Sequence, residues 1–296
     1  EIIRPHMVTL DMAVVDVNFN NPCFVTLEID NAATQLSVHL IFYVLELGLN
    51  HIVKKADYLV NPSANFVLSL PDLSRYNITT SLSDNNYDAD YDTLFNPFVV
   101  IGFENHILVK DMNGFFSLKV EIPKRSITNS RHKNVTIISG IVQKLKNDFF
   151  VLLQSNHGDL FKLTVSPDTN DRNRPLVQLS YFDTIQNSHQ LHIFKNGYLF
   201  ALSEMNNNFL FQFEKLGVEK NDFSNVLTSK DPNKSLVFEP SIKLQNLSIL
   251  SQQLNLNPSI KSQIVSDSPL SIATKHFTNN KIITLTNAVN YSNLIS

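Results

Sequence analysis

Five basic side chains gather near the middle of the sequence: Lys124, Arg125, Arg131, His132 and Lys133. Guanidinium and ammonium groups at this density could contact phosphate, an RNA backbone or an acidic protein surface. A solvated loop has the same composition, and no aromatic side chains suited to stacking bases accompany the cluster. We therefore keep Lys124, Arg125, Arg131 and Lys133 as candidate binding residues, with a plain surface loop as the alternative.

An acidic stretch, residues 84–92, is the first candidate for a metal site. A calcium loop of the EF-hand type needs a glycine at its sixth position and a glutamate at its twelfth. Neither residue stands at those positions when the loop is counted from Asp84 or from Asp88. A solvated acidic loop is the better interpretation of this stretch.

The histidines give no metal site either. His189 and His192 are three residues apart on an expected strand, where alternation sends their side chains to opposite faces. His157 and Asp159 lie in an expected hairpin turn, where polar residues are ordinary. The sequence therefore predicts no metal and no cofactor.

Motifs of nucleophilic and phosphate chemistry are missing. The sequence contains no G-x-S-x-G elbow, Walker loop, G-x-G-x-x-G or H-E-x-x-H. The single cysteine, Cys23, cannot form an intramolecular disulfide or supply a zinc site that needs two thiolates. It follows Pro22 at an expected strand start, which indicates a half-buried structural thiol. We therefore expect a protein without a catalytic site.

The composition of the chain limits the kinds of fold that can carry these residues. The chain has 296 residues, of which 43% are hydrophobic and 17% charged, and this composition excludes wholesale disorder. A formal net charge of −3 gives no global attraction to nucleic acid or to anionic lipid. No run of about 18 apolar residues is present, so no membrane span is expected. Only seven glycines occur, so Asn and Asp must build many turns.

A hairpin repeats along the chain. Apolar and β-branched runs pair across short polar turns at 98–109, 149–163 and 198–213, with looser copies at 24–45 and 271–285. The copies recur at intervals of roughly 50 to 60 residues, a spacing typical of repeat architectures. Each hairpin has strand-like neighbours, so the repeating unit has four strands, which is the blade of a β-propeller. No sustained helical period is present, so few or no helices are expected.

The sequence thus predicts an all-β fold, a β-propeller of four-stranded antiparallel blades. A large β-sandwich is the alternative, but a sandwich need not repeat its hairpin at a fixed spacing. We expect one partial propeller domain over 1–296, and two polar segments, 74–96 and 217–234, as loop insertions. The expected blade units are 1–60, 61–123, 133–183, 184–247 and 248–296.

Several stretches carry a resemblance to a known family. They occur in the expected order at 19–24, 41–55, 64–71, 122–125, 158–164, 181–184 and 195–204, and the most diagnostic is IFYVLELGLNHIVKK. They are similar to the family of the large β-propeller subunit of splicing factor 3b, damaged-DNA-binding protein 1 and the large subunit of the cleavage and polyadenylation specificity factor. Colinear similarity extends over roughly residues 8–250, and it favours the splicing branch.

The resemblance implies a fold of three seven-bladed propellers, of which this chain would be most of the first. It implies a nuclear scaffold in the U2 small nuclear ribonucleoprotein, which selects the intron branch site. The implied partners are a HEAT-repeat subunit and small subunits of splicing factor 3b, with RNA contact indirect or confined to loops.

Two other functions stay open at this point: an adaptor of a ubiquitin ligase or of the cleavage and polyadenylation machinery, and an enzyme with its site in the propeller channel. Five blades of a seven-bladed ring would leave two open edges, and exposed edges promote aggregation. We therefore expect the isolated segment to be poorly soluble.

Overall fold

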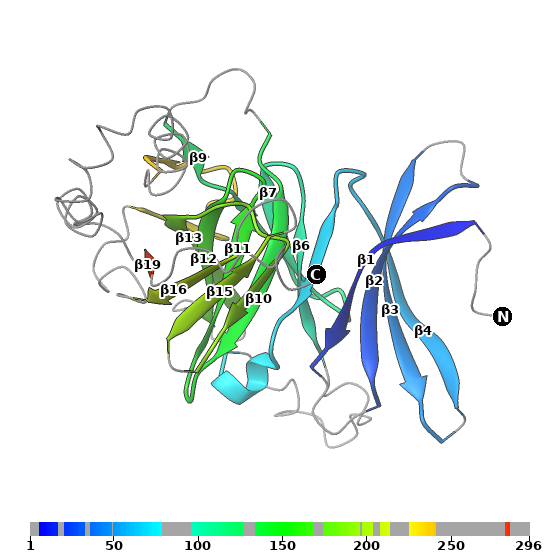
Figure 1. Cartoon of the computed structure of the whole chain (residues 1–296). Coiled ribbons are helices and arrows are strands. Elements are labelled where there is room, and N and C mark those ends of the chain that lie inside the picture. Colours follow the sequence, from blue (N-terminus) through cyan, green and yellow to red (C-terminus); the bar gives the residue numbers. More distant parts are fainter. Residues whose placement is uncertain are drawn as a thin grey trace, which may run out of the picture.

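The chain folds into a series of antiparallel β-sheets joined by short turns (Figure 1). The computed structural model describes residues 6–16, 21–32, 36–48, 50–78, 96–126, 134–168, 174–195, 197–203, 208–213, 225–240 and 282–284. In these ranges the single helical element is a 3-10 turn, η1 (Leu73–Tyr76), capped by the Asp72 carboxylate. The prediction of an all-β fold is confirmed.

Two four-stranded sheets come from the first part of the chain, each with its strands in sequence order. The first sheet contains β1 (Met7–Val15), β2 (Cys23–Asp30), β3 (Ser37–Glu46) and β4 (His51–Val60). The second sheet contains β5 (Phe66–Ser69), β6 (Phe98–Gly102), β7 (His106–Asp111) and β8 (Ser117–Glu121).

Two further sheets and a short ribbon follow. The third sheet contains β10 (Ile137–Lys144), β11 (Phe149–Ser155), β12 (Asp159–Pro167), β13 (Pro175–Thr184) and, as a fifth strand, β17 (Val226–Thr228). The fourth sheet contains β14 (Gln190–Ile193), β15 (Tyr198–Leu202), β16 (Phe209–Phe213) and β19 (Ile282–Thr284). The ribbon pairs β9 (Lys124–Arg125) with β18 (Val237–Phe238) in parallel.

Asparagine builds several of the sharp turns, as the low glycine content predicts. Asn50, Asn77 and Asn105 adopt positive φ angles of 47°, 54° and 66°. Asparagine tolerates this left-handed region better than other residues with a side chain. Asn105 lies in the turn between β6 and β7, and its backbone N–H donates to the carbonyl of Val135 at 2.8 Å.

The sheets are arranged as in a propeller. The first strand of each sheet lies against the first strand of the next, since β1 contacts β5, β5 contacts β10 and β10 contacts β14. Figure 1 shows the sheets side by side, with β1 to β4 at one side and β10 to β13 toward the other. Radial packing about a common line through the first strands is the arrangement of propeller blades.

An apolar cluster fills each of the three spaces between neighbouring sheets. Strand β6 contributes to two of these clusters. Val99 and Ile101 face the first sheet, whereas Phe98 and Val100 face the third. Strand β11 does the same with Phe149 and Val151 on one face and Phe150 and Leu152 on the other. Burial on both faces explains why these strands appear as continuous apolar runs in the sequence.

The structure differs from the expected loop insertions at two places. Segment 217–234 contains β17, whose short pairing with β13 is fixed by the buried side chain of Leu227. Segment 74–96 contains most of η1, anchored by buried Leu73, while residues 79–95, with the acidic stretch, lie outside the described residues. The expected last hairpin is described only at β19, which pairs with β16 of the preceding expected unit.

Candidate interaction surface at the basic segment

The basic segment begins in the link between the second and third sheets. Lys124 and Arg125 form β9, where the N–H of Lys124 donates to the carbonyl of Leu236 at 2.8 Å and the N–H of Ser126 to the carbonyl of Phe238 at 2.8 Å. Lys124 is exposed, and so is its partner across the ribbon, Val237. The two side chains therefore present one cation and one apolar group to solvent.

The partner strand β18 is held in place by aromatic packing. The ring of Phe238 stacks on Tyr181 of β13 with centroids 4.1 Å apart and meets Phe161 of β12 edge to face at 5.9 Å. The chain between β17 and β18 therefore returns from the outer edge of the third sheet to the link that carries β9. Stacked and edge-to-face rings stabilise such a contact beyond their buried area.

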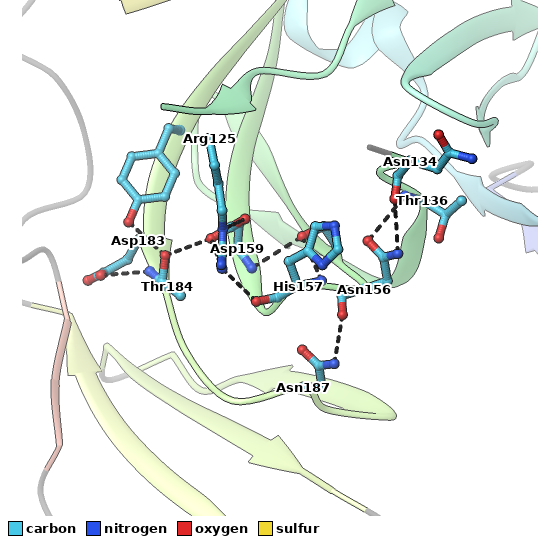
Figure 2. A network of polar contacts seen from close by, with 11 residues as sticks. Arg125, Asn134, Thr136, Asn156, His157, Asp159, Asp183, Thr184 and Asn187 are labelled. Carbon is cyan, nitrogen blue, oxygen red and sulfur yellow. Dashed lines mark hydrogen bonds and ion pairs between the residues drawn. The ribbon is translucent and has the colours of Figure 1, made fainter. Parts of the chain in front are cut away.

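Arg125 lies in a polar network rather than pointing freely to solvent (Figure 2). Its Nε and Nη2 donate to the two carboxylate oxygens of Asp159, each at 2.8 Å, and Nη2 also donates to the carbonyl of His157 at 2.7 Å. The Asp159 side chain is 2% exposed and that of Arg125 is 24% exposed. This bidentate pair is a structural joint, because the Asp159 carboxylate alone would be a buried charge without compensation.

The carboxylate of Asp159 receives further support from β13. The hydroxyl of Thr184 donates to Asp159 Oδ1 at 2.8 Å and lies 2.8 Å from the hydroxyl of Tyr181. Because the single hydroxyl proton of Thr184 is used toward Asp159, the Tyr181 hydroxyl must donate to Thr184. The network thus joins the inter-sheet link to two strands of the third sheet, β12 and β13, and to the turn that precedes β12.

Asparagine side chains extend the same network toward neighbouring chain segments (Figure 2). The amide of Asn156, in the turn between β11 and β12, accepts from the N–H of Thr136 at 3.3 Å and donates to the carbonyl of Asn134 at 3.2 Å. Asn187, ahead of β14, donates to the carbonyl of Asn156 at 2.8 Å. These two amides therefore connect the turn between β11 and β12 with the segment before β10 and with the segment before β14.

The predicted binding residues that the structure describes have different surroundings. Lys124 is exposed and free to meet a partner surface, whereas Arg125 is engaged by Asp159. Arg131, His132 and Lys133 lie outside the described residues. The sequence predicts Asp159 to be an ordinary turn residue, and no local signal relates it to an arginine 34 positions earlier.

Cys23 and the two histidines considered as metal ligands also lie in the described ranges. Cys23 is fully buried rather than half-buried, at the start of β2, and burial raises the pKa of its thiol to about 11. His192 is exposed on β14, and His189 precedes that strand. Among the described residues, no three His, Cys, Asp or Glu side chains are grouped as they would be in a metal site.

The sheets, their radial packing and the structural use of the polar residues define a segment of a β-propeller. A family model described as the RSE1/DDB1/CPSF1 first beta-propeller matches residues 2–253. The chain belongs to this family.

Three of the relatives that match carry the names of splicing factors. Pre-mRNA-splicing factor RSE1 of Eremothecium gossypii is 44% identical over 297 residues, covering all of this chain and 22% of the relative. The protein of the same name from Kluyveromyces lactis is 36% identical over the same span, again 22% of its length. Splicing factor 3B subunit 3 of Drosophila melanogaster is 29% identical over 277 residues, covering 89% of this chain and 21% of the relative.

The chain spans about a fifth of the length of these relatives. In the part of the chain that the structure describes, no helix has the length and apolar character of a membrane span.

Proposed function

We propose that the chain is part of a non-catalytic scaffold subunit of splicing factor 3b, which supports branch-site recognition by the U2 small nuclear ribonucleoprotein. The observation that carries this proposal is the 44% identity, over the whole chain, to a protein named pre-mRNA-splicing factor RSE1. Similarity to splicing proteins from fungi and an insect supports the same assignment. The protein then acts in the nucleus.

A scaffold role agrees with how the polar residues of the chain are used. Arg125, Asp159 and the asparagine amides bind one another and the backbone, which fixes the sheets relative to their links. Rigid sheets with exposed turns present loops to partners without needing a reactive pocket. The proposed partners are a HEAT-repeat subunit and the small subunits of splicing factor 3b.

Contact with RNA is proposed to be indirect or confined to loops. Lys124 and its exposed neighbour Val237 offer one small mixed surface for such a contact. A phosphate contact by one lysine contributes a salt-dependent term but no base selectivity.

Affinity purification of the tagged protein from its own cells tests the proposal. We expect a HEAT-repeat protein in stoichiometric amount together with U2 RNA. Recovery as a free monomer would refute the scaffold role. Recovery with a cullin or with endonuclease subunits of the cleavage machinery, and without spliceosomal RNA, would assign the protein to another branch of the family.

A further inference from the structure

A cavity of about 270 Å³ lies at one end of the third sheet, beside the hairpin that joins β12 to β13. It is lined by Asp168, Arg174, Pro175, Leu176, Ser229 and Lys230. The N–H of Asp168 donates to the carbonyl of Arg174 at 2.9 Å, which closes the hairpin and brings these two residues together. A cavity of this size admits one small group rather than a whole cofactor.

The cavity is present because β17 covers only part of β13. Strand β17 pairs with residues 178–180 of β13, and the N–H of Ser229 then donates to the carbonyl of Val177 at 2.9 Å. In the described part of the chain no strand pairs with β13 beyond this point on that side. The first residues of β13, Pro175 and Leu176, therefore form an apolar wall of the cavity.

Two hydrogen-bond donors in the cavity are available to a ligand. Arg174 is exposed, and in the described part of the chain its guanidinium has no hydrogen-bond or ion-pair partner. The hydroxyl oxygen of Ser229 accepts the N–H of Val177 at 3.2 Å, so the hydroxyl proton itself can be donated to a ligand. Because a guanidinium donates and never accepts, the complementary ligand is an anion.

The charges around the cavity favour a singly charged anion. Nζ of Lys230 lies 2.5 Å from Oδ1 of Asp168, so these two charges offset each other. Arg174 then leaves the lining with one net positive charge. A doubly charged phosphate would be repelled by the Asp168 carboxylate, whereas a ligand carboxylate matches the guanidinium in bidentate geometry.

We propose that this cavity binds the carboxylate of an aspartate or glutamate side chain from an acidic segment of a partner protein. Arg174 binds the carboxylate in bidentate geometry, and the Ser229 hydroxyl donates a further hydrogen bond. The apolar wall contacts the methylene groups of the acidic side chain. Lys230 neutralises the Asp168 carboxylate, which would otherwise oppose the ligand. The proposal does not depend on the splicing function.

Site-resolved arginine modification of the full-length protein tests the proposal. Phenylglyoxal modifies free guanidinium groups, and mass spectrometry after proteolysis follows each arginine separately. We expect a hexaglutamate peptide, titrated at constant ionic strength, to slow modification of Arg174 by about threefold or more, because the free fraction falls as 1/(1 + [L]/Kd). Hexaglutamine is the uncharged control peptide. Arg75, exposed in η1, is the control arginine and should keep its rate.

Two lysine variants separate the cavity from general charge effects. Lys230→Gln leaves the Asp168 carboxylate without its cation beside the ligand, so hexaglutamate should no longer protect Arg174. Lys234→Gln removes the same charge at an exposed position further along the same segment, outside the cavity lining, and should retain the protection. Equal protection in the two variants would contradict the assigned role of Lys230.

The outcomes of the modification experiment are distinct. Unchanged modification of Arg174 in the presence of hexaglutamate, or equal protection of Arg75, would overturn the proposal. Stronger protection by inorganic phosphate than by hexaglutamate would also overturn it, and would assign the cavity to a phosphorylated ligand. Absence of the HEAT-repeat protein and U2 RNA from the purified protein, with Arg174 still protected, would instead count against the proposed function alone.

Discussion

Arg125 shows how a residue that resembles a ligand-binding group in sequence serves the fold. Its bidentate pair with Asp159 is almost fully enclosed on the carboxylate side. We expect Arg125→Ala to lower the free energy of unfolding by about 3 kcal/mol, because Asp159 would remain as a buried, uncompensated charge. Hydrogen exchange of the β12 and β13 amides in the full-length protein measures this loss.

The neighbouring lysine provides the matched control. Lys124 is exposed and makes its ribbon contact through the backbone, so Lys124→Ala should change stability by no more than about 0.5 kcal/mol. If Arg125→Ala were equally neutral while both variants weakened partner binding, the pair with Asp159 would not be the structural joint described above.

Cys23 makes a prediction about pH and reactivity. Burial raises its thiol pKa to about 11 from an ordinary value near 9, so the folded protein retains the proton over a range in which the unfolded chain loses it. This contribution to stability is complete below pH 9 and is lost as the pH rises through 9 toward 11. At pH 8 the thiol should react with iodoacetamide only after unfolding, because the thiolate is the nucleophile and the native site is enclosed.

Rapid alkylation of Cys23 in the folded protein at pH 8 would contradict this burial. Mass spectrometry in the presence and absence of urea distinguishes the two cases. No other thiol confuses the result, because Cys23 is the only cysteine of the chain.

At the scale of elements, the turn between β11 and β12 depends on one close approach. Gly158 has φ = 82°, and a Cβ built there would lie 2.1 Å from the carbonyl oxygen of Ile185. We expect Gly158→Ala to cost about 3 kcal/mol or more, from backbone strain together with steric displacement of the segment ahead of β14. Hydrogen exchange of the β11 and β12 amides in the full-length protein reports the loss.

A second glycine, Gly197, separates the effect of backbone strain from that of steric displacement. Its φ of 85° is nearly the same, but a Cβ there would meet nothing within 4 Å. Gly197→Ala should therefore cost only about 1 kcal/mol, the backbone term alone. Similar losses in both variants would mean that the approach of Ile185 does not constrain the turn.

Strands could be predicted from sequence where burial on both faces made them apolar, as in β6 and β11. Strand β17 could not, because three residues in a polar segment are too short to show a period, and its position depends on β13. The pair of Arg125 and Asp159 could not be predicted from the sequence either. It depends on where the link between the second and third sheets lies relative to β12. The local residue pattern therefore predicts individual strands. Contacts between distant segments depend on how the sheets pack, which the local pattern does not show.

For the molecule as a whole, open sheet faces lead to a prediction about the isolated chain. The outer face of the first sheet exposes Met12, Val14 and Leu59 to water. We expect the chain of 296 residues, expressed alone, to be poorly soluble and to associate through such faces. A monomeric preparation that melts cooperatively would contradict this, and sedimentation followed by calorimetry decides between the two.

The central claim, a splicing scaffold in the family of first propellers, is tested most directly by rapid depletion of the protein in its own cells, followed by RNA sequencing. If the protein supports branch-site recognition, introns should be retained widely, with unspliced precursors accumulating before the first step of splicing. Unchanged intron removal together with altered 3′-end cleavage, or with no RNA defect at all, would contradict it.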